Sequence, residues 1–177
     1  MVHVTNGSSA GTPLADLVYS MAMSRVLSVL RDTLNKDGLC SAMASSGFHH
    51  NVVDVSFVDD VAIPCLGCAS EIIAKTGRVA SSAFSVFRTF GMTLNFKPGK
   101  SEAILGFFGP GTKAAKQELT MANHLIPITA GDDTHIRVVS SYQHLGTCIG
   151  IYMNMCEEVT KRNGMMRAES TLLCKNP

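Results

Sequence analysis

A run of β-branched and aromatic residues, interrupted by two adjacent aspartates, constrains the fold of this chain more than any other feature. The run extends over residues 52–58, stops at Asp59 and Asp60, and resumes over 61–63 before Pro64. β-Branched and aromatic residues favour extended strands, and a polar break between two such stretches favours a turn. The sequence therefore predicts a tight β-hairpin with two acidic residues at its tip.

Helical periodicity flanks this hairpin on both sides. Apolar residues recur at three- and four-residue intervals over 13–34, where Pro13 suits a first helical turn, and again over 71–90, which Gly91 can end. The remaining pattern predicts a loop over 35–47, a strand over 102–108, a short helix over 113–123, strands over 136–139 and 142–150, and a more polar helix over 155–173. This order predicts an α+β fold with helices on one face of an antiparallel sheet.

The composition fits one folded domain of ordinary size. Of the 177 residues 46% are hydrophobic and 16% are charged, so the chain has enough apolar material for a core and differs from disordered chains. Lysine and arginine number 15 against 14 acidic residues, a net charge of +1, which gives no overall attraction to nucleic acid or to a membrane surface. The sequence shows no secretory signal and no long apolar span, which predicts a soluble intracellular protein with reduced cysteines.

The two aspartates of the predicted hairpin are the strongest candidates for chemistry. Adjacent carboxylates repel each other, and a two-residue turn without Gly or Asn is poor turn chemistry, so a bound divalent cation would offset a local cost. Mg²⁺ takes carboxylate oxygens and stays partly hydrated, and paired acids hold the metals in two-metal phosphoryl transfer. An ordinary acidic surface turn is the alternative that Asp59 and Asp60 by themselves leave open.

Four segments in order along the chain sharpen this interpretation. They are Gly11-Thr12-Pro13-Leu14-Ala15-Asp16, Phe57-Val58-Asp59-Asp60, GMTLNFKPGKSE over 91–102, and Tyr142-Gln143-His144-Leu145-Gly146-Thr147. Together they resemble motifs B, C, D and E of the palm in reverse transcriptases of non-long-terminal-repeat (LINE-like) retrotransposons, and the final helix resembles the start of the thumb. Each segment by itself is a weak signal, whereas the ordered set is specific.

The resemblance implies an RNA-directed DNA polymerase that uses Mg²⁺ or Mn²⁺, an RNA template, a DNA primer and deoxynucleoside triphosphates. It implies that Asp59 and Asp60 are the motif C metal ligands and that Lys100 is the motif D lysine, which protonates the departing pyrophosphate. The implied substrate contacts are Gly11 and Pro13 in the motif B turn, beside nucleotide and template, and Tyr142, Leu145 and Gly146 in the primer-grip hairpin.

The chain departs from this family in one decisive respect. The family's site needs a third aspartate, from motif A upstream of motif B, and the first acidic residue here is Asp16, inside the motif B match. Because motif A and the fingers have no counterpart, we expect no polymerase activity from these residues alone, and an exposed hairpin edge and helix face. The implied domains are an irregular lead-in over 1–12, a partial palm over 13–139, and the primer-grip strand with the start of the thumb over 140–177.

Two other classes of function stay open. A non-catalytic module that binds nucleic acid or a partner protein, or a decayed element, would keep the fold without the chemistry. A metal-dependent phosphohydrolase would need a further ligand beside Asp59 and Asp60, for which Asp54 or His50 is available.

Two smaller features have simple structural interpretations. Cys65 and Cys68 have the CxxC spacing of metal and redox sites, but the chain holds no second such pair, which favours two small buried core residues. His49 and His50 precede the hairpin, and we expect them to form part of a loop.

Overall fold

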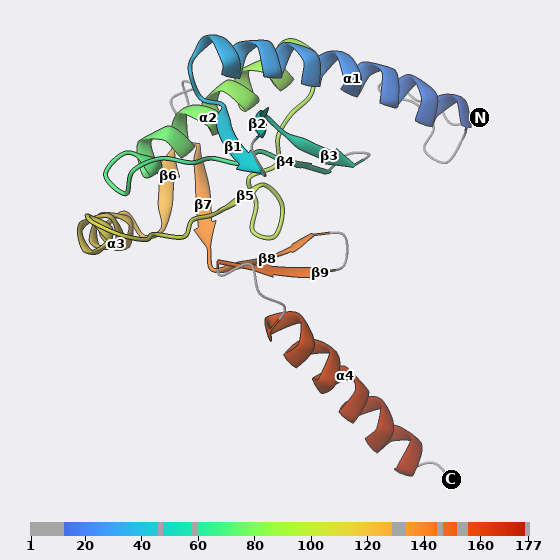
Figure 1. Ribbon diagram of the computed structural model, residues 1–177. Coiled ribbons are helices and arrows are strands. Elements are labelled where there is room, and N and C mark those ends of the chain that lie inside the picture. The colour runs from blue at the N-terminus through green and yellow to red at the C-terminus, as the bar shows by residue number, and fades with distance from the viewer. Residues whose placement is uncertain are drawn as a thin grey trace. The chain divides into compact units, whose positions relative to one another are not determined.

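The computed structural model describes residues 13–45, 48–57, 60–128, 134–144, 147–151 and 156–175, and these form an α+β fold (Figure 1). The helices are α1 (Pro13–Lys36), α2 (Ile72–Thr89), α3 (Thr112–Met121) and α4 (Cys156–Lys175). The strands are β1 (Ser41–Ser45), β2 (Phe48–Val52), β3 (Val55–Phe57), β4 (Asp60–Ala62), β5 (Glu102–Ile104), β6 (Leu125–Pro127), β7 (His135–Val139), β8 (Ser141–His144) and β9 (Thr147–Gly150). All four predicted helices are confirmed, with ends that differ by a few residues.

The chain packs as two compact units that share α2. Unit 1 holds the described residues up to Gly67 together with Arg78–Leu94, and unit 2 holds Cys68–Gly77 together with the described residues from Asn95 onward. The first turns of α2 therefore belong to unit 2 and its remainder belongs to unit 1. The domain boundaries predicted from the sequence stay predictions.

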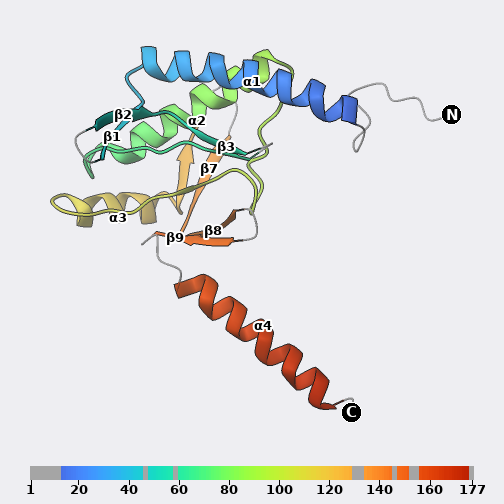
Figure 2. The same cartoon turned by 45° about the vertical axis from the view of Figure 1, so that its right-hand side comes forward.

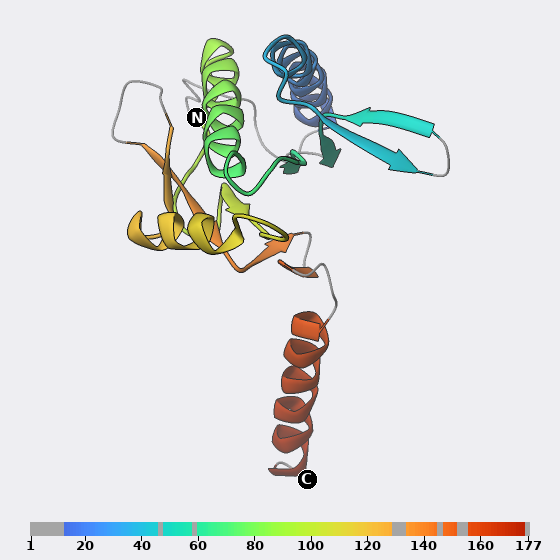
Figure 3. The same cartoon turned by 60° about the vertical axis from the view of Figure 1, so that its left-hand side comes forward.

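The core of unit 1 lies between α1 and the second part of α2, which run side by side (Figure 3). Residues at helical spacing on α1 are buried against residues at helical spacing on α2. They are Met23, Val26, Leu27, Leu30 and Leu34 on α1, and Val79, Ala83, Val86 and Phe87 on α2. Because full burial of such a side chain contributes roughly 1.5–3 kcal/mol, this contact is the main source of stability for unit 1.

Both helices of this core end in the same hydrogen-bonded cap. At the end of α1 the amide of Leu39 donates to the carbonyl of Leu34, and at the end of α2 the amide of Met92 donates to the carbonyl of Phe87. This six-residue closure needs a left-handed residue just before the donor, and Gly38 (φ 64°) and Gly91 (φ 73°) supply it. The predicted helix stop at Gly91 is confirmed.

Two antiparallel hairpins complete unit 1. β3 pairs with β4, as predicted, and β1 pairs with β2 in the register Ser41↔Val52. The loop predicted over 35–47 is wrong for Ser41–Ser45, because strand pairing with β2 orders a stretch of small residues that has little strand propensity of its own. The buried hydroxyl of Ser41 also donates to the Pro64 carbonyl and accepts the Leu66 amide, both at 2.9 Å, which ties β1 to the chain after β4.

Unit 2 contains a mixed three-stranded sheet in the order β5-β7-β6 (Figure 1). β6 pairs antiparallel with β7, but β5 pairs parallel with it, so the prediction of an antiparallel sheet is wrong for β5. The parallel pairing arises because the connection from β5 to β7 includes α3 and β6, and β6 runs antiparallel to β7 and so returns the chain to the end of the sheet at which β5 begins. At Gly77 of α2, a Cβ atom would lie 3.1 Å from Ile126 Cγ2 and 3.2 Å from the Pro127 carbonyl oxygen, so a larger residue here would require β6 to shift by a few tenths of an ångström.

The C-terminal part of unit 2 is a hairpin followed by α4. The single strand predicted over 142–150 is wrong: β8 and β9 pair with each other in the register Tyr142↔Ile149. α4 runs away from this hairpin, and its residues from Val159 to Arg167 are all exposed (Figures 1 and 2). None of the described helices is long and apolar enough to cross a membrane.

Candidate functional site

The hairpin β3–β4 carries the acidic segment singled out in the sequence. Its register is Val55↔Ala62, Ser56↔Val61 and Phe57↔Asp60, so Asp60 opens β4 and only residues 58 and 59 separate the two strands. The prediction that both acids lie at the tip is therefore wrong for Asp60, which is part of the strand. Asp59 lies outside the described residues.

Alternation along β4 determines which way Asp60 points. Val61 and Ile63 pack against the core of unit 1. Because successive residues of a strand point to opposite faces, Asp60 lies on the face away from that core, and its side chain is half-buried. The carboxylate thus lies on the outer face of a hairpin whose inner face packs against apolar residues.

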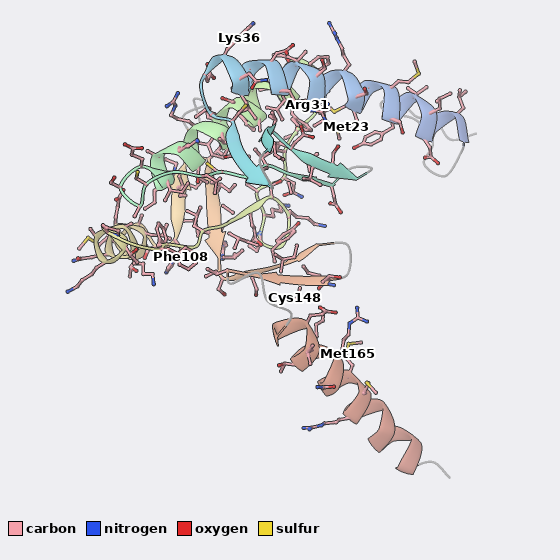
Figure 4. The ribbon with its side chains drawn as sticks, in the orientation of Figure 1. Met23, Arg31, Lys36, Phe108, Cys148 and Met165 are labelled. Carbon is pink, nitrogen blue, oxygen red and sulfur yellow. The ribbon has the colours of Figure 1, made fainter. Side chains whose placement is uncertain are left out.

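An ion pair fixes the base of the same hairpin. Asp54, between β2 and β3, accepts two hydrogen bonds from Arg31 of α1, at 2.5 Å from Nε and 2.9 Å from Nη2 (Figure 4 labels Arg31). The Asp54 side chain is 2% exposed and that of Arg31 is 47% exposed. The hydrogen bond to Asp54 and, less strongly, its charge raise the pKa of the Arg31 guanidinium above its ordinary value, and burial opposes them.

This pair answers one question left open by the sequence. Asp54 was a candidate third ligand for a metal-dependent phosphohydrolase, but both of its oxygens are engaged by Arg31. A carboxylate in a buried two-bond pair with arginine serves the fold, because releasing it would leave a buried charge without compensation. His50 and His49 lie in β2, so the predicted loop is wrong for them, and the structure does not describe their side chains.

Lys100 lies in a short loop closed by its own hydrogen bonds. The Asn95 carbonyl accepts the Ser101 amide at 2.8 Å, and the Asn95 side chain accepts the Lys97 amide at 3.1 Å. The Lys97 carbonyl accepts the Lys100 amide, and the Glu102 carboxylate accepts the Gly99 amide. The backbone of this loop, which we call the lysine loop (95–102), is held internally, while the Lys100 side chain is exposed.

Tyr142 joins the lysine loop to the hairpin β8–β9. Its hydroxyl donates to the carbonyl oxygen of Lys100 at 2.7 Å, across 42 positions of sequence. The two segments that resemble motifs D and E are therefore in direct contact within unit 2. Leu145 and Gly146, the other predicted residues of the primer-grip hairpin, lie outside the described residues.

A second hydrogen-bonded contact attaches α4 to the same hairpin. Glu158 of α4 is buried and accepts the backbone amide of Cys148 at 2.8 Å and Nε of Arg162 at 2.5 Å. The hydrogen bond from Arg162, followed by that from Cys148, lowers the pKa of Glu158 below its ordinary value, against the opposing effect of burial.

The remaining predicted residues give little further geometry. Pro13 begins α1, as its fixed φ favours, and Gly11 lies outside the described residues. Cys65 is half-buried against the core of unit 1, but Cys68 is exposed, so the prediction of two buried cysteines is wrong for Cys68. The Cys68 carbonyl accepts the amides of Glu71 and Ile72 at the start of α2, which places this residue where the chain turns into a helix.

The fit to a metal rests on the aspartates alone. Within the part of the chain that the structure describes, no three His, Cys, Asp or Glu residues come together as a ligand set. Carboxylate oxygens are nevertheless the ligands that Mg²⁺ and Mn²⁺ prefer, and Asp60 offers one on an outer face. Of the two aspartates predicted as metal ligands, the structure thus describes only Asp60.

Little in the sequence predicts the contacts of Asp54 and Tyr142. Asp54 stands between Val53 and Val55, and a lone charge inside a β-branched run indicates a buried polar group that needs a partner. Nothing local identifies Arg31 as that partner, or Lys100 as the partner of Tyr142. Comparison of the chain with protein families, with curated proteins and with solved structures found no match.

Proposed function

We propose that this chain is the palm and the beginning of the thumb of a non-long-terminal-repeat retrotransposon reverse transcriptase, an RNA-directed DNA polymerase. The observation that carries the proposal is the hairpin β3–β4, which follows α1, precedes α2 and presents Asp60 on the face away from the core of unit 1. The ordered resemblance of four segments to motifs B to E supports it, and the contact between the lysine loop and β8–β9 is consistent with it.

The proposed chemistry assigns one task to each group. Asp59 and Asp60 would hold Mg²⁺ or Mn²⁺, which when bound neutralises charge on the nucleotide phosphates and orients them for attack by the primer hydroxyl. Lys100 would donate a proton to the departing pyrophosphate, because an ammonium group near a leaving phosphate offsets its developing charge.

The proposed substrates are an RNA template, a DNA primer and deoxynucleoside triphosphates. Gly11 and Pro13 would lie beside nucleotide and template, and the hairpin β8–β9, with Leu145 and Gly146 between its strands, would grip the primer end. The chemistry also needs a third carboxylate, for which the 177 residues offer no motif A counterpart. Since loss of one metal carboxylate costs several orders of magnitude in rate, we expect no activity from this chain by itself.

A second candidate is a non-catalytic module that binds a partner through α1. One observation favours it: Leu14, Leu17, Val18 and Met21 form an exposed apolar stripe on the face of α1 opposite its buried residues. A helix that is apolar on two opposite faces is usually covered on both. A net charge of +1 makes a protein partner the better interpretation of this stripe than a nucleic acid.

Titration with Mn²⁺ tests the metal assignment. Bound Mn²⁺ broadens nearby amide signals, so we expect saturable loss of the signals of Val61 and Ala62 in β4. Asp59→Asn and Asp60→Asn should each weaken the apparent affinity for Mn²⁺ by more than about tenfold. Mutation of a residue that only orients a metal ligand already weakens metal binding by about that factor. Asp32→Asn, on the exposed face of α1, is the matched control and should leave the titration unchanged.

One result would contradict the metal assignment, and another would contradict the expectation that the chain is inactive by itself. Absence of Mn²⁺ binding to the folded chain would indicate that the aspartates form an ordinary acidic turn. Template-dependent extension of a primer by the chain, abolished in Asp59→Asn, would overturn the expectation that it is inactive by itself.

A further inference from the structure

The carbonyl oxygen that Tyr142 holds belongs to the residue with the proposed proton donor. The hydroxyl of Tyr142 lies 2.7 Å from the carbonyl oxygen of Lys100. The peptide group of Lys100 is also held on its other side, because its amide donates to the Lys97 carbonyl at 3.1 Å. The backbone position of Lys100 therefore depends both on the lysine loop and on Tyr142.

The rest of the lysine loop is rigid in the same way. The Gly99 amide donates to the Glu102 carboxylate, and Glu102 begins β5. Gly99 has φ of 75°, a left-handed conformation that only glycine adopts without strain, and it gives the loop its tight turn. The hydrogen bonds of the Lys97 and Gly99 amides hold the part of the loop before Lys100, so a displacement of the Lys100 carbonyl acts first on Lys100 itself.

The hairpin β8–β9 is the element that can displace the Lys100 carbonyl. Tyr142 lies in β8 opposite Ile149 of β9, and its side chain is half-buried. Because the hydroxyl is already used as a donor to Lys100, it is not the group expected to donate to a primer strand. The resemblance had placed Tyr142 among the substrate contacts, and the hydrogen bond gives it a different task.

We propose that Tyr142 is a positioning residue that couples the hairpin β8–β9 to Lys100, so that a primer strand gripped by the hairpin sets the place of the Lys100 ammonium. This inference rests on the proposed function. It adds a regulation of the same site: occupancy of the hairpin by a strand changes the position of the proton donor through the bond from Tyr142 to Lys100.

The coupling can be measured without enzyme activity. In the full chain, lysine side chains are labelled with ¹³C-methyl groups, which keep their charge, and a short RNA–DNA hybrid with a recessed DNA 3′ end is titrated in. The amides of β9 report occupancy of the hairpin, and the methyl signal of Lys100 reports the loop. Lys97, in the same loop but one turn away from the contact, is the internal reference.

In the wild-type chain we expect the Lys100 signal to shift with the same apparent Kd as the β9 amides. In Tyr142→Phe, which removes only the hydroxyl, the shift of Lys100 at saturation of the β9 amides should fall by about fivefold, the change in an equilibrium that one hydrogen bond supports. Tyr19→Phe removes a hydroxyl from α1 and should leave the shift of Lys100 unchanged.

Three outcomes would overturn the inference, and they separate it from the proposed function. An equal Lys100 shift in Tyr142→Phe and wild type, at equal occupancy of the hairpin, overturns the role of Tyr142 and leaves the proposed function standing. Equal loss of the Lys97 and Lys100 shifts in Tyr142→Phe means that the hydroxyl only stabilises the fold of the loop. No response of the β9 amides to the hybrid in the wild-type chain removes the proposed function, and the inference falls with it.

Discussion

The hairpins β3–β4 and β8–β9 are both short antiparallel pairs, yet they are held by different kinds of interaction. β3–β4 packs Val61 against the buried core of unit 1 and is fixed at its base by the pair of Arg31 and Asp54. β8–β9 is held by two hydrogen bonds that use backbone groups, from Tyr142 to the Lys100 carbonyl and from the Cys148 amide to Glu158.

The difference determines how each hairpin responds to change. Apolar packing is non-directional and depends on many contacts, whereas a hydrogen bond is lost when one atom is removed. We therefore expect β3–β4 to stay in place as a platform for Asp60. We expect β8–β9 to be the more easily displaced of the two hairpins, because loss of one donor or acceptor removes one of its contacts.

The largest effect should come from the core that supports β3–β4. Leu30 is 1% exposed between α1 and α2, and Leu30→Ala leaves a cavity there. We expect a loss of about 2–5 kcal/mol in the free energy of unfolding, measured by urea denaturation. A loss confined to β8–β9 amides in hydrogen exchange, with unit 1 unchanged, would contradict the assignment of this core to unit 1.

The next effect should come from the ion pair at the base of β3–β4. Arg31→Met leaves the buried Asp54 carboxylate without its partner, and we expect a loss of about 2 kcal/mol, below the range for fully buried pairs because Arg31 is half-exposed. Arg31→Lys keeps the positive charge but cannot form both hydrogen bonds, so it should recover part of the free energy of unfolding that Arg31→Met loses. The control is Arg25→Met on the exposed face of α1; an equal loss there would show that the pair with Asp54 contributes nothing specific.

A pH titration tests the attachment of α4 to β8–β9. Because the folded protein lowers the pKa of Glu158, the stabilisation from Glu158 is present above its ordinary pKa of 4.5 and is lost as the pH falls through the lower, folded-state value. We expect hydrogen-exchange protection of the Cys148 amide to fall in that acidic window. Glu158→Gln should remove this pH dependence, whereas Glu118→Gln, exposed on α3, should keep it.

The smallest effect should come from the outer face of α1. Leu17 is 57% exposed, so Leu17→Ser should change the free energy of unfolding by less than about 0.5 kcal/mol, although the same side chain at position 30 belongs to the core. A larger loss in the monomer would mean that this face is covered by part of the chain. A change in the sedimentation coefficient would instead favour the candidate function in which the stripe binds a partner.

Local sequence signals predicted the helices and the hairpin β3–β4 because their causes are local. The three- and four-residue spacing of α1 and the glycine at position 91 act within a few residues. β1 was not predicted because Ser41–Ser45 gain strand structure only by pairing with β2. The parallel pairing of β5 was not predicted because its partner β7 lies beyond α3, and no local signal identifies so distant a partner.

The candidate site shows the same division. Asp60 could be selected from its place in a β-branched run, and Lys100 and Tyr142 from the resemblance of their segments. The partners of Asp54 and Tyr142 could not, since they lie 23 and 42 positions away and only the packed units bring them together. Single residues were predictable, and the contacts that position them were not.

The sharing of α2 between the two units has a consequence for the order of folding during synthesis. Unit 1 needs no residue beyond Leu94, so it can close as soon as that residue leaves the ribosome. The first turns of α2 must wait longer, because Gly77 packs against Ile126 of β6, which is made later. We therefore expect the helix to dock from its far end first, through Val79, Ala83, Val86 and Phe87 against α1.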